Sequence, residues 1–318
     1  MTSQIEHTLE KDLDDAVSEV IAGWERPGDP REHWRIAAGL GWTTILDDFR
    51  ADGTQEQNQR ELADAACGAV TALARGGIAL PLRQTLVARA AARTPVSEVD
   101  AIAVHPTAQG LWAPIADVLV AADGSVSHGA PGDEAGRDLA GRPYRLAPPP
   151  PPEIPLRLTA LADVLRCQEM IGAAQGAVAE TRRYVTQRVQ FGRPLVAIPA
   201  VRTLLGQVKV DLRELETSTY EARHRLFGDD SDALAFSLVT AREVASAVAP
   251  RIAQTTHQLH GAMGITHEAG LHWRTKLLWT GCDEGVPRRD HGDEAVPADE
   301  PSLWSLTTPG TLRSGARP

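Results

Sequence analysis

Cysteine is scarce in this sequence of 318 residues, which contains three cysteines and no Cys-x-x-Cys pair. An odd and sparse cysteine count argues against a disulfide-stabilised scaffold. It is typical of proteins from a reducing compartment, so we expect a cytoplasmic protein.

Long apolar runs are also lacking. No stretch of about 18 uncharged apolar residues occurs, which is the length that a membrane-spanning helix needs. The N-terminal segment MTSQIEHTLEKDLDD is acidic and has no apolar core of the kind found in signal peptides. We therefore expect neither a membrane span nor a signal peptide.

Positive charge and aromatic side chains are in short supply. The 32 Lys and Arg residues are outnumbered by 42 Asp and Glu residues, which gives a formal net charge of -10. Nucleic-acid binding needs a basic face, so a general DNA-binding function is excluded. Aromatic residues make up only 4% of the chain. The core must then be mostly Ala, Leu and Val, which favours the packing of helix on helix.

Apolar periodicity divides the chain into four parts. Residues 1–92 are predicted to form an N-terminal helical domain, because helical spacing recurs over 9–26, 31–39, 57–75 and 80–92. Two short apolar runs at 101–104 and 116–121 indicate a reduced β region over 93–155, which closes with a stiff proline-rich connection. Residues 283–318 are acidic and then rich in Gly, Pro, Ser and Thr, which predicts a disordered tail.

The third part, residues 156–282, is predicted to be a four-helix bundle. Its helices are expected over about 156–187, 198–227, 232–260 and 267–280. Long helices joined by short turns pack antiparallel. The small residues around Gly172 and Gly176 would let a neighbouring helix approach closely. The expected fold class is therefore mostly α.

The turn after the first bundle helix is the first candidate site. It contains Arg188, Gln190 and Phe191 in the sequence RVQFGRPL. An arginine presents a fixed fork of donors that suits a phosphate or pyrophosphate. The glutamine can bond a neutral ligand edge, and the phenylalanine offers a flat apolar surface. An ordinary helix–helix turn with a surface arginine would have the same composition.

The turn after the third bundle helix is the second candidate site. It contains Gln258, Gly261 and Gly264 in the sequence QLHGAMGITHE. Backbone N–H groups exposed at such a turn can hold an anion. The alternative is a C-cap glycine followed by a turn glycine. In an antiparallel bundle both turns lie at the same end, so one ligand could meet both.

The two turns together resemble the C-terminal domain of the acyl-CoA dehydrogenase family. The usual forms in that family are RxQFGxP and QxHGGxGxTxE; the first occurs here as RVQFGRP and the second, with one departure, as QLHGAMGITHE, in the right order. The resemblance is clear over about 156–280 and loose over 1–92. It implies an acyl-CoA dehydrogenase-like fold with an N-terminal helical part, a reduced β middle domain and a C-terminal four-helix bundle.

This resemblance also implies a cofactor and a reaction. Family members are FAD-dependent flavoproteins of lipid metabolism. They oxidise an acyl-CoA thioester to a trans-2-enoyl-CoA and pass the electrons to an electron-transfer flavoprotein. In members of that family, the two motifs contact the pyrophosphate and adenine side of the neighbouring subunit's FAD. The matching positions here are Arg188, Gln190, Phe191, Gln258, Gly261 and Gly264.

The sequence departs from the family pattern in two respects. The second glycine of the usual pair is Ala262, and the β region is short and lacks flavin-holding loops such as TEPxxGSD and WITN. This pattern resembles the short subunits of bacterial heteromeric α2β2 acyl-CoA dehydrogenases, which are associated with steroid side chains and other bulky acyl groups. The alternatives are a self-sufficient FAD-dependent homodimer and a non-catalytic structural subunit.

The catalytic base is the least determined feature. One family position falls on Gly285, one residue past Glu284, and the other falls on Ala162, beside Asp163. The remaining candidate is Glu268, which we expect to begin a helix close to the ligand. It could instead serve only to stabilise that helix N-terminus. A subunit without any base is the further alternative.

Clustered histidines suggest a metal site, but their spacing does not support one. His267, Glu268 and His272 form HExxxH rather than the HExxH of zinc hydrolases. Residues five apart do not share a helix face, so we predict no metal.

Overall fold

Helices dominate the fold, which agrees with the predicted class. The computed structural model describes residues 2–25, 28–49, 56–108, 110–129, 133–146 and 153–284. The N-terminal helices are α1 (Thr2–Ala22), α2 (Pro30–Gly39), α3 (Glu56–Arg75) and α4 (Leu82–Ala91). The bundle helices are α5 (Leu156–Gln187), α6 (Pro199–Arg225), α7 (Ser231–His260) and α8 (Leu271–Asp283).

The β structure is small. Strands β1 (Ala103–Val104), β2 (Val118–Val120) and β3 (Val126–His128) form one sheet, in which β1 pairs parallel to β2 and β2 pairs antiparallel to β3. Two further antiparallel pairs join β4 (Gly136–Arg137) to β5 (Pro143–Tyr144) and β6 (Val189–Gln190) to β7 (Arg193–Pro194).

Side-chain caps fix where several helices begin. Asp29 accepts a hydrogen bond from the backbone N–H of Arg31 at 2.9 Å, and Pro30 follows it at the first helical position. Asp230 caps α7 in the same way, because its carboxylate accepts from the N–H of Ala233 at 2.9 Å. Such caps satisfy N–H groups that have no partner inside the helix.

Close contact between α3 and α5 depends on two glycines. A Cβ atom at Gly172 would collide with the backbone of Thr71, and one at Gly176 would collide with the carbonyl oxygen of Arg75. The small residues of α5 therefore let the N-terminal helices pack directly on the bundle, as the sequence predicts. The core around them consists mainly of Ala, Leu and Val side chains.

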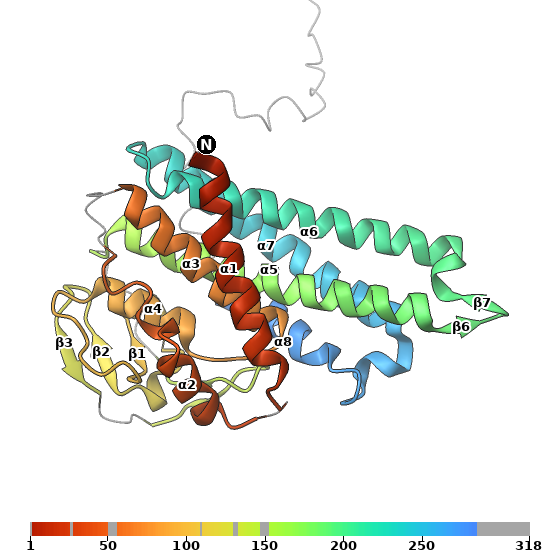
Figure 1. Cartoon of the computed structure of the whole chain (residues 1–318), viewed down its shortest axis with the longest axis horizontal. Coiled ribbons are helices and arrows are strands. Elements are labelled where there is room, and N and C mark those ends of the chain that lie inside the picture. Colours follow the sequence, from red (N-terminus) through yellow and green to blue (C-terminus); the bar gives the residue numbers. More distant parts are fainter. Residues whose placement is uncertain are drawn as a thin grey trace, which may run out of the picture.

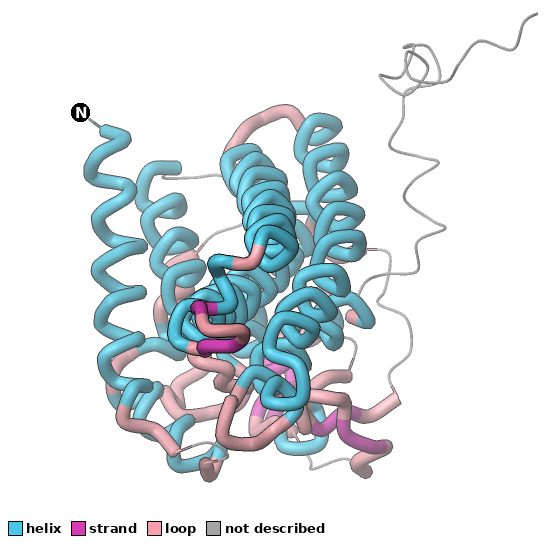
Figure 2. The backbone as a smooth tube through the Cα atoms, turned by 90° about the vertical axis from the view of Figure 1, so that its right-hand side faces the viewer, coloured by secondary structure: helices cyan, strands magenta, loops and turns pink. Residues whose placement is uncertain are grey.

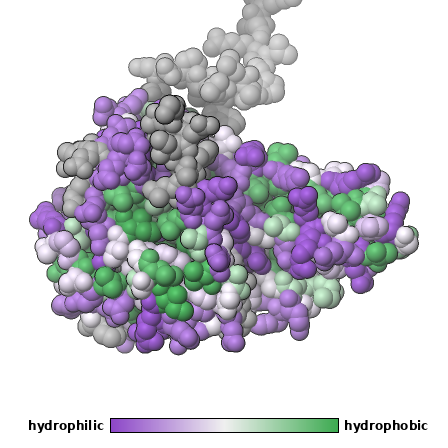
Figure 3. Space-filling model, in the orientation of Figure 1, coloured by the Kyte–Doolittle hydropathy of each residue, from purple (hydrophilic) through white to green (hydrophobic). Residues whose placement is uncertain are grey.

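The two ends of the molecule differ. Helices α5 and α6 run along its long axis, with sheet β1–β3 at one end and the β6–β7 hairpin at the other (Figure 1). Figure 2 looks onto the hairpin end and shows the hairpin in front of the bundle helices. On the face drawn in Figure 3, apolar side chains reach the surface in separate areas with hydrophilic side chains between them.

The last bundle helix is shorter than the sequence predicts. The fourth helix begins at Leu271 rather than near residue 267, because Gly270 turns the chain with a φ of 63° just before it.

Helix α7 with the turn after it, Ser231–Ile265, is apolar and long enough to cross a membrane by length and composition alone. Core helices pass the same test, and α7 packs against α5, α6 and α8.

Some predicted segments lie outside the described residues. The proline run at 148–152 does, and so does the predicted tail, apart from Asp283 and Glu284.

Candidate functional site

The first motif forms a two-residue β-hairpin rather than a simple helix–helix turn. Phe191 and Gly192 connect β6 to β7 with φ angles of 53° and 75°. Two consecutive positive φ angles are the signature of a type I′ turn, whose twist matches that of the strands. A phenylalanine rarely adopts this conformation, yet here its side chain is 88% exposed at the hairpin tip.

Arg188 stands at the base of this hairpin. Its backbone N–H caps α5 by donating to the carbonyl oxygen of Tyr184 at 2.8 Å, and its own carbonyl accepts from the N–H of Leu195 at 2.9 Å. The side chains of Arg188 and Gln190 are exposed and make no hydrogen bond or ion pair with the part of the chain that the structure describes. Both are therefore available to a ligand.

The second motif is a tight 3₁₀ turn between α7 and α8. Gly261 has a φ of 58° and a ψ of -142°, a conformation open essentially to glycine alone, and a Cβ atom there would meet nothing within 4 Å. Gln258 and Ala262 are exposed. The open face beside Gly261 leaves room for a ligand to approach the backbone closely.

Gly264 has a different role in the same turn. It is buried, and a Cβ atom there would lie 2.8 Å from the Cβ of His260 and 3.2 Å from Nδ1 of His257. This glycine lets the turn pack on the last residues of α7.

An aromatic contact joins the two motifs. The ring of Tyr184, near the end of α5, stacks on the imidazole of His260, at the end of α7, with a centroid distance of 4.6 Å and an angle of 20°. Both motif turns therefore lie at the same end of the bundle, as the antiparallel arrangement predicts. This is the end that lies away from sheet β1–β3 (Figure 1). We call this pair of turns the hairpin end of the molecule.

These features meet the needs of a dinucleotide pyrophosphate. An exposed arginine without an internal partner lies at the same end as a glycine turn whose open face can admit a backbone contact. A guanidinium group and a turn of backbone are both suited to bind the oxygens of an anionic phosphate.

Glu268 does not begin a helix. It lies in an exposed turn, three residues before Leu271, and the first turn of α8 contains no acidic residue. The expectation that it starts a helix is wrong, because Gly270 and not Glu268 precedes the helical residues. That Glu268 lies close to a bound ligand stays a prediction.

Asp163 is already paired. Its carboxylate forms ion pairs with Arg242 of α7 and, at 3.7 Å, with Arg166 of its own helix. It is therefore not a free carboxylate.

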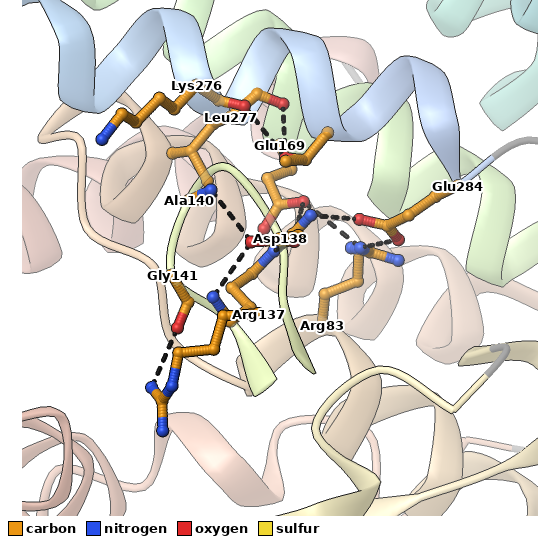
Figure 4. A network of polar contacts seen from close by, with 11 residues as sticks. Arg83, Arg137, Asp138, Ala140, Gly141, Glu169, Lys276, Leu277 and Glu284 are labelled. Atoms are coloured by element: carbon orange, nitrogen blue, oxygen red, sulfur yellow. Dashed lines mark hydrogen bonds and ion pairs between the residues drawn. The ribbon is translucent and has the colours of Figure 1, made fainter. Parts of the chain in front are cut away.

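Glu284 belongs to a buried ionic network, which is shown in Figure 4. Its carboxylate pairs with Arg83 of α4 and lies 2.7 Å from Arg142 of the β4–β5 loop. Glu169 of α5 contacts the same arginines at 3.3 and 3.4 Å, and Asp138 binds Arg142 at 2.6 Å. These five residues, which we call the arginine–carboxylate network, tie together α4, α5, α8 and the β4–β5 loop.

The network fixes the protonation of Glu284. Burial alone would raise the pKa of this carboxyl group, but the positive charges of Arg83 and Arg142 outweigh burial and lower it to about 2. A general base for an α-proton needs a carboxylate that can accept a proton near neutral pH. Glu284 is therefore held as a structural carboxylate.

The network was missed from the sequence. Its members lie between residues 83 and 284, and no local period brings them together. The available signal was Arg83 within an apolar helical segment, since a charged side chain on an otherwise buried face needs a partner.

The clustered histidines make contacts with neighbouring side chains. Among the described residues no group of three or more His, Cys, Asp or Glu side chains could hold a metal ion. His257 instead contacts Thr275 at 2.8 Å, and His272 packs beside Trp273.

Comparison with known proteins supports the resemblance. Residues 164–283 match the acyl-CoA dehydrogenase C-terminal domain. The chain is 31% identical over 111 residues to the acyl-CoA dehydrogenase IpdE2 of Mycobacterium tuberculosis (strain ATCC 25618 / H37Rv), which covers 35% of this chain and 33% of that protein. The matched region thus spans about a third of that relative.

Solved structures show the same fold over most of the chain. One is the ChsE4–ChsE5 complex from Mycobacterium tuberculosis, with a TM-score of 0.64 and 17% identity over 87% of this chain and 93% of that chain. Another is the Tcur3481–Tcur3483 steroid ACAD, with a TM-score of 0.61 and 18% identity over 89% of this chain and 93% of that chain. The acyl-CoA dehydrogenase fold predicted from the sequence is confirmed.

Proposed function

We propose that this chain is a subunit of an FAD-dependent acyl-CoA dehydrogenase, because residues 164–283 match the C-terminal domain of that family and the chain has the fold of its solved members. In this proposal the hairpin end completes an FAD site that a longer partner subunit holds for the most part. Bound FAD would supply the two-electron oxidation of the acyl group, and an electron-transfer flavoprotein would receive the electrons.

The observation that carries the proposal is the position of the hairpin end. Both motifs lie together, exposed, at the end of the bundle away from sheet β1–β3. A cofactor at this end would be remote from the chain's own β sheet. Its isoalloxazine contacts would then have to come from another polypeptide.

Exposed apolar side chains at the same end favour a protein partner. Phe191 is 88% exposed and Ile265, in the glycine turn, is 78% exposed. Exposed apolar groups that gather at one place mark interaction surfaces. A partner seated there would cover both groups and exclude water from the pyrophosphate.

Each motif residue has a proposed role. Arg188 would pair with the pyrophosphate, and Gln190 would bond a neutral edge beside Phe191. Gln258, Gly261 and Gly264 would present the second turn, with the open face of Gly261 toward the dinucleotide. The structurally similar Tcur3481–Tcur3483 protein is described as a steroid ACAD, which supports a steroid or other bulky acyl-CoA as the proposed substrate class.

Flavin content after purification tests the subunit arrangement. We expect the chain alone to be colourless and the complex with its partner, co-expressed from a neighbouring gene, to be yellow with FAD absorbance. A yellow chain without any partner would contradict the heteromer and support a homodimer. Colourless protein in both preparations would support a structural subunit.

Glu268 is the proposed base of this chain. An exposed turn is wet, so the role requires that the partner cover it in the assembled enzyme. We expect Glu268→Gln to abolish enoyl-CoA formation in the complex while the flavin spectrum stays unchanged. Turnover at the wild-type rate would assign the base to the partner subunit.

A further inference from the structure

The side chain of His260 packs on helix α5 just before the hairpin and also on the glycine turn. Its ring stacks on Tyr184, one helical turn before Arg188, and its Cβ atom lies under Gly264. The first contact fixes it to the end of α5, from which the hairpin starts, and the second fixes it to the glycine turn. The side chain is 3% exposed, so both contacts are made in a dry environment.

Hydrogen bonds fix the orientation of this imidazole. Nδ1 lies 2.8 Å from the carbonyl oxygen of Thr256 and 3.4 Å from Oγ1 of Thr181, whose hydroxyl donates to the carbonyl oxygen of Ala177 at 2.7 Å. A carbonyl oxygen can only accept, so Nδ1 carries the proton and donates to Thr256. This arrangement holds the ring plane at an angle of 20° to that of Tyr184.

Burial keeps the ring neutral. It lowers the pKa of His260 below the ordinary value for histidine, and Nε2 is buried without a hydrogen-bond partner among the described residues. A neutral ring with one fixed donor has a single low-energy position between α5 and α7. The contact is therefore suited to set a distance.

We propose that His260, together with Tyr184, is a positioning pair that sets the separation of the hairpin from the glycine turn. The inference rests on the proposed function, since that separation decides whether Arg188 and the backbone near Gly261 can meet one dinucleotide. Neither residue of the pair touches the ligand. Both act through the turns that they hold.

Hydrogen exchange of the full chain tests the coupling without any cofactor. Two backbone amides report on the turns: the N–H of Leu195 closes the hairpin onto Arg188, and the N–H of Thr266 closes the glycine turn onto Met263. We expect Tyr184→Leu to speed exchange at both amides about tenfold, which is the loss that an aromatic pair of this kind would give. His260→Asn, which removes the ring but keeps an amide donor, should do the same.

Matched variants separate a lost ring contact from general destabilisation. Tyr184→Phe keeps the ring and should leave both amides unchanged. Tyr220→Leu removes a comparable tyrosine beside His224, at the far end of α6, and should also leave them unchanged. The double variant Tyr184→Leu with His260→Asn should exchange no faster than either single variant. Acceleration confined to the substituted turn, or additive effects, would overturn the proposal.

Titration with FAD separates this inference from the proposed function. In the assembled complex we expect Tyr184→Leu to weaken FAD binding about tenfold. The midpoint of thermal unfolding should stay unchanged in the matched variant Tyr184→Phe. Unchanged FAD binding by Arg188→Ala would overturn the proposed function but leave the exchange coupling intact. Weakened binding by Arg188→Ala, with no exchange effect of Tyr184→Leu, would overturn only the positioning role.

Discussion

Arg188→Ala is expected to release FAD from the assembled complex while each chain stays folded. The guanidinium of Arg188 is exposed and has no partner among the described residues, so its removal costs the fold little. A hydrogen bond to a charged group contributes about 1.5–3 kcal/mol, which corresponds to a loss of affinity of roughly ten- to a hundredfold. Flavin fluorescence after dilution of the complex measures the released FAD.

Arg157→Ala provides the matched control for this variant. Arg157 lies at the other end of the same helix, about 45 Å from Arg188 along the helix axis. It donates to the carbonyl oxygen of Gly228 at 3.2 Å, so its loss affects only that end of the bundle. FAD retained at full occupancy by Arg188→Ala would remove the pyrophosphate contact from the proposal.

Glu284→Gln is expected to lower the free energy of unfolding by about 3–5 kcal/mol, because it removes one of the carboxylates that neutralise the buried side chains of Arg83 and Arg142. The matched control is Glu221→Gln, which breaks an exposed pair with Arg225 and should cost at most about 1 kcal/mol. Denaturant unfolding of the full chain measures both. Equal small losses for the two variants would show that the arginine–carboxylate network contributes little to stability.

The same variant has a defined pH dependence. The pKa of Glu284 is lowered to about 2 in the folded chain, so its contribution is complete above the pKa of the unfolded chain and is lost as the pH falls toward 2. The difference in stability between wild type and Glu284→Gln should therefore be largest near neutral pH and should shrink below about pH 4.5. A difference that grows on acidification would contradict the assigned ion pairs.

The long helices could be predicted from the sequence because their apolar period repeats over many turns. Helix α5 was expected over 156–187 and has those bounds, since Pro155 precedes it and the strand-forming motif follows it. The shared location of the two turns followed from the antiparallel topology alone. These features depend on local periodicity and loop length, which a single sequence carries.

Short elements and remote pairs were beyond the sequence. Strands β6 and β7 have two residues each, which is too few to show an alternating pattern. The sequence therefore predicts only a turn at this place. The start of α8 was misplaced because Gly270, and not the acidic residue before it, ends the irregular segment. The arginine–carboxylate network needed tertiary structure, since its partners are brought together only by packing.

The glycine contact between α3 and α5 has a consequence for how the chain can be divided. The family match begins at residue 164, which suggests a detachable module. Yet α5 has no side chain at Gly172 and Gly176, and the backbone of α3 packs directly against both positions, together with Arg274 of α8 at Gly176. A fragment starting at the bundle would expose this part of the α5 backbone to water. The carboxy-terminal half therefore needs the amino-terminal helices to cover it.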